Sequence, residues 1–486
     1  MFSAEFRAKV AAEFQDAELG DARRPRRLLK IVERVSLDPS ASFPAAMGTP
    51  KRLEAFYRFM SNPGFDAAEM LTPHNEGTID RAKAVGEIVC IHDSTVVEYS
   101  GESREMLGAT NTKNHQGYVA HVSLAVRADS SRMPLGVLGV ETYTRTGTKT
   151  KGKKRGAKKK TKNAPLDPER ESRRWWRAVE HVEDVAENAF AVIHVADAEA
   201  DFFELLARMS ERGCRYVIRA GQLDRRVANG TQTHPLREML DALQPQTWRT
   251  IDLSKRADKG HDQPDKQRKR HPPRAGRQAE VAIAATTVML PRTRYCDAEL
   301  THVPVNVVRV WEPAPPNGEP AIEWVLFTSE PIAELGQLER VVDLYRLRWI
   351  IEEFFKALKT GCALEKRQLG SYDALCKGLA LFIPIAYQML SLRSLEATNP
   401  DAPASDVCTA IELHVLTMVA EAHAAPPVTV RDVLALLARL GGHIKHNGRP
   451  GWQVLGRGYE KLLAYCAGYE LARAEPTLTK RKKYDQ

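Results

Sequence analysis

One short segment, "YRLRWIIEEFFKALKTG" (residues 345–361), combines residue types that could bind metal ions and phosphates. On a helix that turns 100° per residue, five of its polar side chains fall within an arc of about 80°. These are Tyr345, Arg348, Glu352, Lys356 and Lys359. Glu352 is in line with the cations, whereas Glu353 lies about 100° to one side. The pattern fits either a metal ligand among phosphate-binding groups or a solvated row of ion pairs.

The helix alone favours the solvated interpretation. Glu352 is four residues from both Arg348 and Lys356, and each i,i+4 pair is worth only ~0.3 kcal/mol on a surface helix. Such pairs are common and contribute little to stability. The apolar residues between Leu347 and Leu358 fill the opposite side and predict that this side is anchored in a core. A metal site would need further acidic ligands elsewhere in the chain, and their presence distinguishes the two interpretations.

Two aspartates follow apolar strand candidates. In "EIVCIHDSTVVEY" the apolar run from Ile88 to Ile91 leads into Asp93, and "FAVIHVAD" ends at Asp197. We expect His92 to point to the other face of its strand, because side chains alternate. Glu199 and Asp201 are expected to interact with the dipole of the following helix. Two aspartates and Glu352 would supply the oxygen ligands for two Mg²⁺ ions, which can activate a nucleophile and stabilise a leaving oxygen in phosphodiester chemistry.

The elements that carry these acids alternate in a recognisable order. "EIVCIHDSTVVEY", "YVAHVSLAV" and "LGVLGVETY" predict three strands of a meander. A helix follows, with Asp167 as its cap and with the apolar stripe Trp175, Val179, Val182 and Ala186. Strand, helix and strand then follow, up to "CRYVIRA". This order predicts an α/β fold with an RNase H-like mixed sheet, in which acids meet at neighbouring strand ends.

The chain of 486 residues is long enough for several domains. Residues 1–70 are expected to be helical, with Asp21 capping a helix that begins with Arg23, Arg24, Arg26 and Arg27. Residues 71–372 form the predicted core. It is interrupted by a β-rich insertion at 222–320. Residues 373–486 are again expected to be helical.

Composition narrows the class of protein. A hydrophobic content of 43% and a charged content of 27% are typical of a soluble globular chain, and the net charge of +9 favours nucleic acid over membrane as partner. The seven cysteines contain no CxxC pair, so neither a disulfide framework nor a zinc site is expected, and a reducing cytoplasm fits best. "GLALFIPIAYQMLSL" is shorter than the ~20 residues of a membrane span and predicts a buried helix.

Two segments are strongly basic. Residues 145–162 hold ten Lys or Arg residues and no acid, and "KQRKRHPPRAGR" spans residues 266–277. Such segments are commonly solvated loops, but their charge density also suits contact with a phosphate backbone.

With these residues in view, the chain resembles bacterial DDE transposases of the insertion-sequence-four group, close in pattern to the transposase of transposon five. The group's helix signature is Tyr, two residues, Arg, three residues, Glu, six residues and Lys. Tyr345, Arg348, Glu352 and Lys359 match it. "LGDARRPRRL" resembles the end-recognition segment, and "RLGGHIKHNGRPGWQVLGRGYEKL" resembles the C-terminal dimerisation region.

The resemblance assigns roles to individual residues. It implies Asp93, Asp197 and Glu352 as catalytic metal ligands for two Mg²⁺ ions, with Mn²⁺ as a substitute. Trp324 would stack on a flipped base. The remaining implied DNA contacts are Arg23, Arg24, Arg27, Arg219, Tyr345, Arg348, Lys356 and Lys359. Gly221 departs from the group, because a basic residue can stand two positions after the Arg of "YVIRAG".

The resemblance also implies cut-and-paste transposition. Hydrolysis nicks the transposon end, the freed 3′-OH forms a hairpin, and the reopened end attacks target DNA. The implied partners are double-stranded DNA with terminal inverted repeats, target DNA, and a second copy of the chain in a synaptic complex. The implied domains are an N-terminal end-binding domain and a C-terminal dimerisation domain. The alternative is a catalytically inactive dimer that binds ends and inhibits transposition.

Overall fold

The computed structural model describes residues 4–100, 106–110, 115–145, 170–229, 232–253, 276–293, 296, 298–419, 426–443 and 452–474. The basic segments at 146–162 and 266–275, the expected cap Asp167 and part of the C-terminal segment at 439–462 lie outside these ranges. The chain divides into two compact units. The first comprises Met1–Val85, Ser94–Lys153 and Ile350–Gln486, and the second comprises Gly86–Asp93 and Lys154–Trp349.

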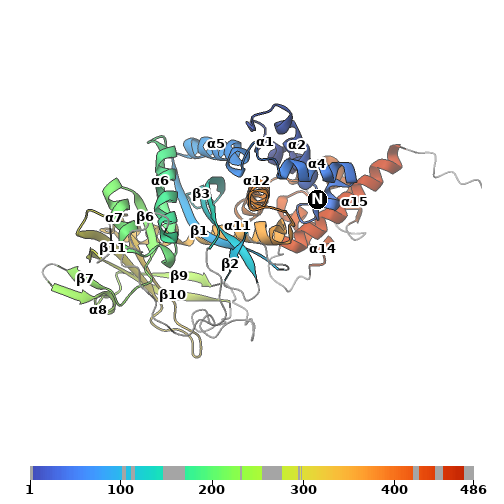
Figure 1. The fold of residues 1–486 in the computed structure, drawn as a ribbon. Helices are drawn as coiled ribbons and strands as arrows, with labels where there is room; N and C mark the ends of the chain where they lie inside the picture. The colour runs from blue at the N-terminus through green and yellow to red at the C-terminus, as the bar shows by residue number, and fades with distance from the viewer. Residues whose placement is uncertain are drawn as a thin grey trace, which may run out of the picture. The chain divides into compact units, whose positions relative to one another are not determined.

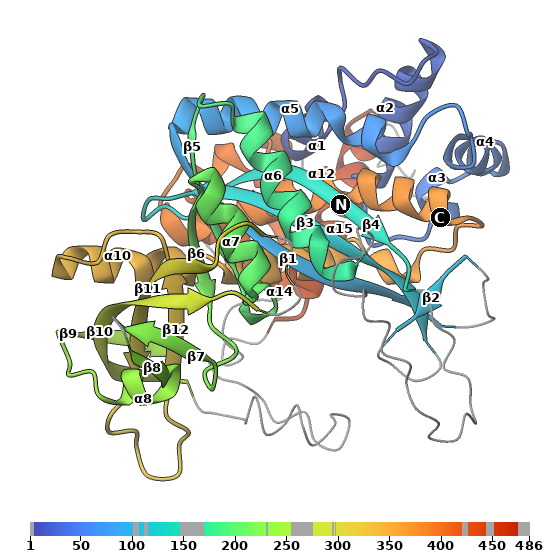
Figure 2. The same cartoon turned by 60° about the vertical axis from the view of Figure 1, so that its left-hand side comes forward.

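A mixed sheet forms the second unit. It begins with the first half of β1 (Glu87–Tyr99), which runs parallel to β5 (Ala191–Ala196), as β5 does to β6 (Arg215–Arg219). Antiparallel strands extend it in the order β12 (Glu323–Thr328), β11 (His302–Trp311), β10 (Arg277–Pro291), β7 (Arg226–Asn229) and β8 (Gln232–Pro235), with β9 (Thr247–Leu253) also paired to β10. The helices of this unit are α6 (Arg174–Ala186), α7 (Phe203–Arg212), α8 (Leu236–Asp241) and α10 (Leu335–Arg346). Figure 2 shows β7 to β10 and α8 together at the lower left.

The first unit contains the other strands of the meander and the terminal helices. β3 (Gln116–Arg127) lies between β2 (Gly108–Ala109) and β1, and it pairs antiparallel with β4 (Pro134–Tyr143). The N-terminal helices are α1 (Ala4–Ala12), α2 (Arg23–Val35), α3 (Phe43–Met47), α4 (Pro50–Met60) and α5 (Ala67–Val85). The later helices, in orange and red in Figure 1, are α11 (Trp349–Lys356), α12 (Tyr372–Thr398), α13 (Ala410–Val419), α14 (Val430–Leu440) and α15 (Trp452–Ala474).

The predicted RNase H-like order is confirmed: β1, β3 and β4 precede the alternation α6, β5, α7 and β6. The predicted apolar stripe of α6 is buried from Trp175 to Ala186. Among the residues of the predicted insertion that the structure describes, β7, β8, β9, β10 and β11 are antiparallel strands, although β7, β8 and β9 were not individually predicted. The limits proposed for the domains remain predictions.

The long helix expected over residues 345–361 is wrong. α10 ends at Arg346, α11 begins at Trp349, and residues 357–361 form a π-helical turn. The amides of Leu347 and Arg348 bond three residues back, to Leu344 and Tyr345, which tightens the chain between the two helices. A uniform turn of 100° per residue therefore applies only within each piece.

α12 is the apolar helix predicted to be buried. Tyr372–Leu395 is long and apolar enough to cross a membrane by length and composition, but 83% of its most apolar window is buried inside the protein. Burial of this kind is typical of a core helix, as predicted, although the helix is longer than its apolar run suggested. Pro384 lies inside it.

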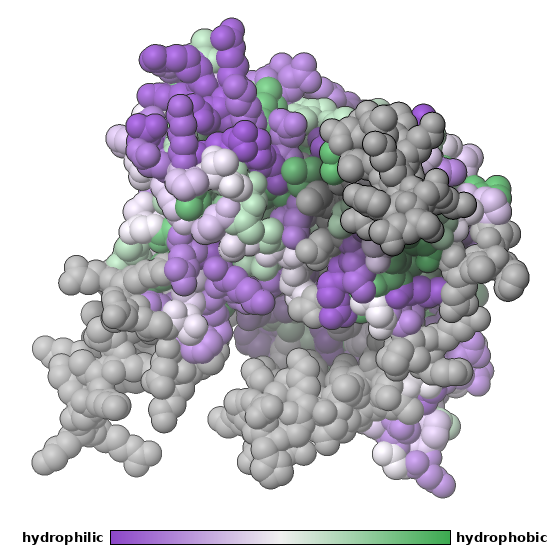
Figure 3. Space-filling view, turned by 90° about the vertical axis from the view of Figure 1, so that its right-hand side faces the viewer, coloured by the Kyte–Doolittle hydropathy of each residue, from purple (hydrophilic) through white to green (hydrophobic). Residues whose placement is uncertain are grey.

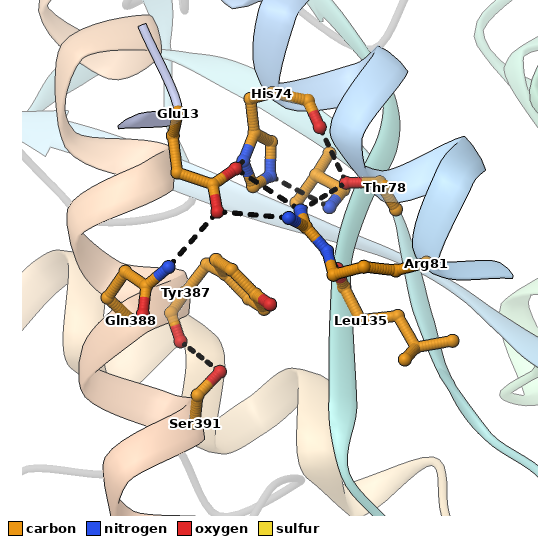
Figure 4. A network of polar contacts seen from close by, with 9 residues as sticks. Glu13, His74, Thr78, Arg81, Leu135, Tyr387, Gln388 and Ser391 are labelled. Carbon is orange, nitrogen blue, oxygen red and sulfur yellow. Dashed lines mark hydrogen bonds and ion pairs between the residues drawn. The ribbon is translucent and has the colours of Figure 1, made fainter. Parts of the chain in front are cut away.

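A buried polar network connects the N-terminal segment to α5, β4 and α12 (Figure 4). Glu13 accepts hydrogen bonds from His74 Nδ1 at 2.6 Å, Arg81 at 3.1 and 3.2 Å, and Gln388 at 3.0 Å. His74 Nε2 accepts from the backbone N–H of Val137 at 3.0 Å, so Nδ1 carries the proton of the neutral ring. Burial lowers the pKa of His74 and outweighs the opposing effect of Glu13.

This network predicts a pH-dependent stability. His74 stays neutral in the folded protein, whereas the unfolded chain protonates it below its ordinary pKa of 6.5, so stability falls as pH drops through that value. We expect the melting temperature of the His74→Gln protein to vary less than that of the wild type between about pH 7 and about pH 5. Thermal unfolding of both proteins across this range tests the expectation, and equal slopes would contradict it.

Candidate active site

The pairing of β1 with β5 brings two aspartates side by side. His92 pairs with Ala196 at the end of the ladder, and the next residues on the two strands are Asp93 and Asp197. Asp197 follows β5 directly, as predicted. Asp93 does not stand at a strand end, because β1 continues to Tyr99. It stands instead where β1 stops pairing with β5, and both side chains are half-buried there.

Asp197 and Asp201 have different surroundings. Asp197 Oδ1 accepts the backbone N–H of Glu199 at 2.8 Å, which caps a short 3-10 turn. Asp201 is buried and accepts from Gly221 N at 2.6 Å, Gln222 N at 3.0 Å and Arg225 at 2.5 Å. Asp201 therefore holds the loop after β6, which leaves Asp197 as the better candidate ligand.

The expected partnership of Glu199 and Asp201 with a helix dipole is wrong. α7 begins only at Phe203, and Glu199 lies 3.2 Å from Arg174 on α6.

The glycine at position 221, where the group can have a basic residue, has a structural explanation. A Cβ there would lie 3.1 Å from the Cβ of Ala198, so a basic side chain at this position would crowd the turn that follows Asp197.

Arg348 lies beside Asp93. Its side chain is 9% exposed, its Nη1 is 3.5 Å from Asp93 Oδ2, and its guanidinium lies 4.6 Å from the ring centroid of Trp349. The break between α10 and α11 positions Arg348, because it is the last residue before α11. A fixed positive charge thus stands next to the first candidate ligand.

Tyr345 lies near Arg348, near Arg219 at the end of β6 and near Trp324 on β12. It is buried, and burial raises its pKa, while the positive charges of Arg348 and Arg219 and a hydrogen bond with Arg219 oppose this effect. Its ring centroid lies 6.1 Å from that of Trp324 on β12. Trp324 is half-buried and not enclosed in the core. Asp197 is close enough to affect the pKa of Tyr345. The second unit thus gathers Asp93, Asp197, Arg219, Trp324, Tyr345 and Arg348.

The remaining residues of the signature belong to the first unit. Glu352 lies in the first turn of α11, four residues after Arg348, and is half-buried. Lys359 donates to the carbonyl of Val96 at 2.5 Å and lies 3.0 Å from Glu365. The π-helical turn is therefore fixed to β1 three residues after Asp93. Lys356 is 60% exposed and pairs with Glu353 at 2.6 Å, not with the Glu352 partner that its spacing suggested.

The N-terminal arginines separate into two kinds. Arg24 donates to the carbonyls of Leu19 and Gly64 at 2.6 and 2.8 Å, which is a structural role. Arg23 is 89% exposed and pairs with Asp21, whose carboxylate accepts the backbone N–H of Arg23 although the cap position belongs to Ala22. Arg27 is exposed. Figure 3 shows hydrophilic side chains over the upper part of one face, at the height of α1 and α2 in Figure 1.

The donor set suits divalent metal ions. Asp93 and Asp197 each present carboxylate oxygens: Asp93 lies 3.5 Å from Arg348, and Asp197 Oδ1 accepts the backbone N–H of Glu199. Hard oxygen donors of this kind are those that Mg²⁺ prefers. A third carboxylate, Glu352, follows Arg348 by four residues.

Comparisons with known proteins agree on two regions of the chain. A family model described as transposase DNA-binding matches residues 7–65, and one described as transposase DDE domain matches residues 171–381. The second match contains Asp197 and Glu352, whereas Asp93 precedes it. Among solved structures, the chain is similar to piggyBac transposase in a cryo-EM structure of its synaptic complex with hairpin DNA, at 8% identity over 100% of this chain and 83% of that one. The TM-score of 0.39 is too low to support any transfer from that protein.

Proposed function

This chain is a DNA transposase of the DDE class with its own DNA-binding domain, and we propose that it carries out cut-and-paste transposition in the manner of the insertion-sequence-four group. The adjacency of Asp93 and Asp197 at the end of the β1–β5 ladder carries this proposal. The substrates would be double-stranded DNA ends with inverted repeats and, after excision, a target DNA in the cytoplasm. Two copies of the chain would hold the paired ends in a synaptic complex.

DDE transposase domains use divalent metal ions. We assign Asp93, Asp197 and Glu352 as the residues that would hold them, with Mg²⁺ as the physiological ion and Mn²⁺ as a substitute. When bound, the two ions would activate the attacking oxygen and stabilise the leaving oxygen at phosphorus. Glu352 is assigned as the third ligand from its place in the signature, four residues after Arg348.

The neighbouring side chains would position the scissile strand. Arg348 offers a planar guanidinium that suits a phosphate, and Trp349 and Asp93 hold it in place. Arg219 and Asp197 both lie near enough to the buried phenol of Tyr345 to affect its pKa. Lys359 would contribute mainly by fixing the α11 segment to β1, because its ammonium is already bonded to Val96 and Glu365.

Hairpin formation would require a base to leave the stack. Trp324 is half-buried and its ring packs near Tyr345, so it combines a fixed position with an accessible surface. Stacking on an aromatic ring is worth about 1–3 kcal/mol per base. Trp324 would therefore stabilise the flipped base during the hairpin steps.

A purified sample of the full chain tests the proposed function. With Mg²⁺ and a labelled DNA duplex that carries a flanked transposon end, we expect release of the flank and a hairpin on the transposon end, seen on a denaturing gel. Release of the flank without a hairpin would leave DDE cleavage in place but remove the hairpin route. End binding without any cleavage in Mg²⁺ or Mn²⁺ would favour the inhibitor alternative.

The arginines of α2 give a second prediction. If exposed Arg27 contacts a phosphate, Arg27→Ala should weaken end binding and reduce the slope of log K against log salt by about 0.9. Arg24→Ala should instead lower the melting temperature, because the carbonyls of Leu19 and Gly64 lose their donor. Binding titrations at several salt concentrations measure the slope. An unchanged slope in Arg27→Ala would remove this residue from the interface.

A further inference from the structure

Cysteine, histidine and glutamate side chains gather on the face of the sheet opposite Asp93. His92 Nε2 lies 2.8 Å from His194 Nδ1, and His194 Nε2 lies 2.8 Å from Glu183 Oε1 on α6. Cys90 precedes His92 by two residues on β1, so both point to the same face, and Asp93 points to the other. Cys90, His92 and His194 are almost fully buried, and the side chain of Glu183 is 24% exposed.

The spacing of three of these groups suits one metal ion. The ligand atoms of Cys90, His92 and His194 all lie within 4.8 Å of one another. One thiol and two imidazoles form a donor set that zinc and similar transition metals prefer over Mg²⁺. Glu183 accepts the second ring N–H of His194, and a carboxylate in this position usually orients a metal-bound histidine.

A second group shares His194 but is the weaker candidate. The ligand atoms of Glu183, His194 and Cys214 also lie within 4.8 Å of one another. This group would use His194 Nε2 and would take Glu183 away from its orienting role. It also includes the one member of the cluster that is partly exposed. If Cys90, His92 and His194 bind the ion, His194 uses Nδ1 and keeps its hydrogen bond to Glu183. Only the hydrogen bond between the two imidazoles is lost.

We propose that Cys90, His92 and His194 bind one transition-metal ion of the zinc class, with Glu183 orienting His194. On binding, Cys90 releases its thiol proton to solvent, and His92 carries its ring proton on Nδ1, so each donor presents a lone pair to the ion. No group is oxidised or reduced. The absence of a CxxC pair predicted no zinc site, but β1 and β5 bring together ligands that are about a hundred residues apart in the chain.

The position of this site suggests what it does. It joins β1 to β5 one residue before Asp93 and three residues before Asp197. The ion would therefore fix the register of the two strands that carry the aspartates, from the face opposite to them. It would be chemically separate from the Mg²⁺ ions, because its ligands are sulfur and nitrogen and theirs are oxygen.

Metal content and spectroscopy of the full-length protein test the proposal. The Asp93→Asn/Asp197→Asn protein serves as parent, so that the carboxylate site contributes no ion. After loading with Zn²⁺ and exhaustive dialysis, we expect about one zinc per chain by mass spectrometry. Adding Cys90→Ala or His194→Gln should reduce this to a small fraction. Adding Cys362→Ala, which removes another buried thiol, should leave it unchanged.

Substitution with Co²⁺ keeps the test valid if a variant fails to fold. The protein with its cluster intact should show a thiolate-to-cobalt charge-transfer band, which requires Cys90 as a ligand. Absence of the thiolate band would overturn the proposal, as would equal zinc content in the parent and in a folded Cys90→Ala protein. In that case Glu183, His194 and His92 form only a hydrogen-bonded chain.

Discussion

Replacing Asp93 or Asp197 by Asn is expected to reduce cleavage of the transposon end by on the order of 10³-fold or more, while binding of the end stays within a few-fold of wild type. Each change removes a negative charge but keeps the side-chain shape, so the β1–β5 ladder should remain intact. Glu352→Gln should have the same effect if Glu352 is the third ligand. Single-turnover cleavage and a gel-shift assay on the same DNA separate the two properties.

Asp201→Asn is the matched control for these variants. Asp201 lies four residues after Asp197, but its carboxylate holds Arg225 and the amides of Gly221 and Gln222. The change should lower stability by about 1–3 kcal/mol and leave cleavage at a permissive temperature nearly unchanged. Undiminished cleavage by Asp197→Asn, or loss of cleavage by a folded Asp201→Asn protein, would reverse the assignment of the second acid.

The alternation of strands and helices made the core predictable. The stripe of α6 and the apolar segments of β1, β3 and β5 have the periods that their structures require, and two acids at the ends of such segments pointed to the site. Asp197 was preferred to Asp201 by resemblance. The structure adds the physical reason that Asp201 is already occupied.

Contacts between distant segments could not be predicted in this way. The break after Arg346 depends on bonds of two amides that no periodicity reveals, and it leaves Arg348 outside both α10 and α11. Buried cations were missed for the same reason. Arg367 donates to the carbonyls of Ala41 and Pro39, and Lys377 donates to that of Asn62 at 2.7 Å. These bonds hold the loops of the N-terminal segment.

These buried donors attach the N-terminal segment to the rest of the first unit. The Glu13 network, Arg367 and Lys377 all connect residues before position 65 to α12 or to the turn that precedes it. The region matched by the DNA-binding model is therefore fixed to the first unit by buried polar contacts and not only by apolar packing. A buried donor that loses its partner lowers the stability of the fold more than a lost surface contact does. The N-terminal segment is therefore stable only in an arrangement that keeps these donors paired.

Arg348 is the residue for which the structure changes the expected behaviour most. Its spacing suggested a solvated position on a helix surface, but its side chain is 9% exposed and lies against Asp93 and Trp349. We expect Arg348→Ala to reduce the single-turnover rate of cleavage by about 10²–10³-fold, as when a fixed charge near a developing anion is removed. Arg348→Lys should recover part of this loss, because it keeps the charge but lacks the planar fork.

The dependence of cleavage on Mg²⁺ distinguishes a role toward DNA from a role in holding Asp93. If Arg348 mainly binds the scissile phosphate, the Arg348→Ala protein should need no more Mg²⁺ for half-maximal rate than wild type, because loss of a cation beside Asp93 favours metal binding. A markedly higher Mg²⁺ requirement would instead show that Arg348 positions the carboxylate. Cleavage by Arg348→Ala at the wild-type rate would contradict both roles and leave the Arg348–Asp93 contact as a structural ion pair.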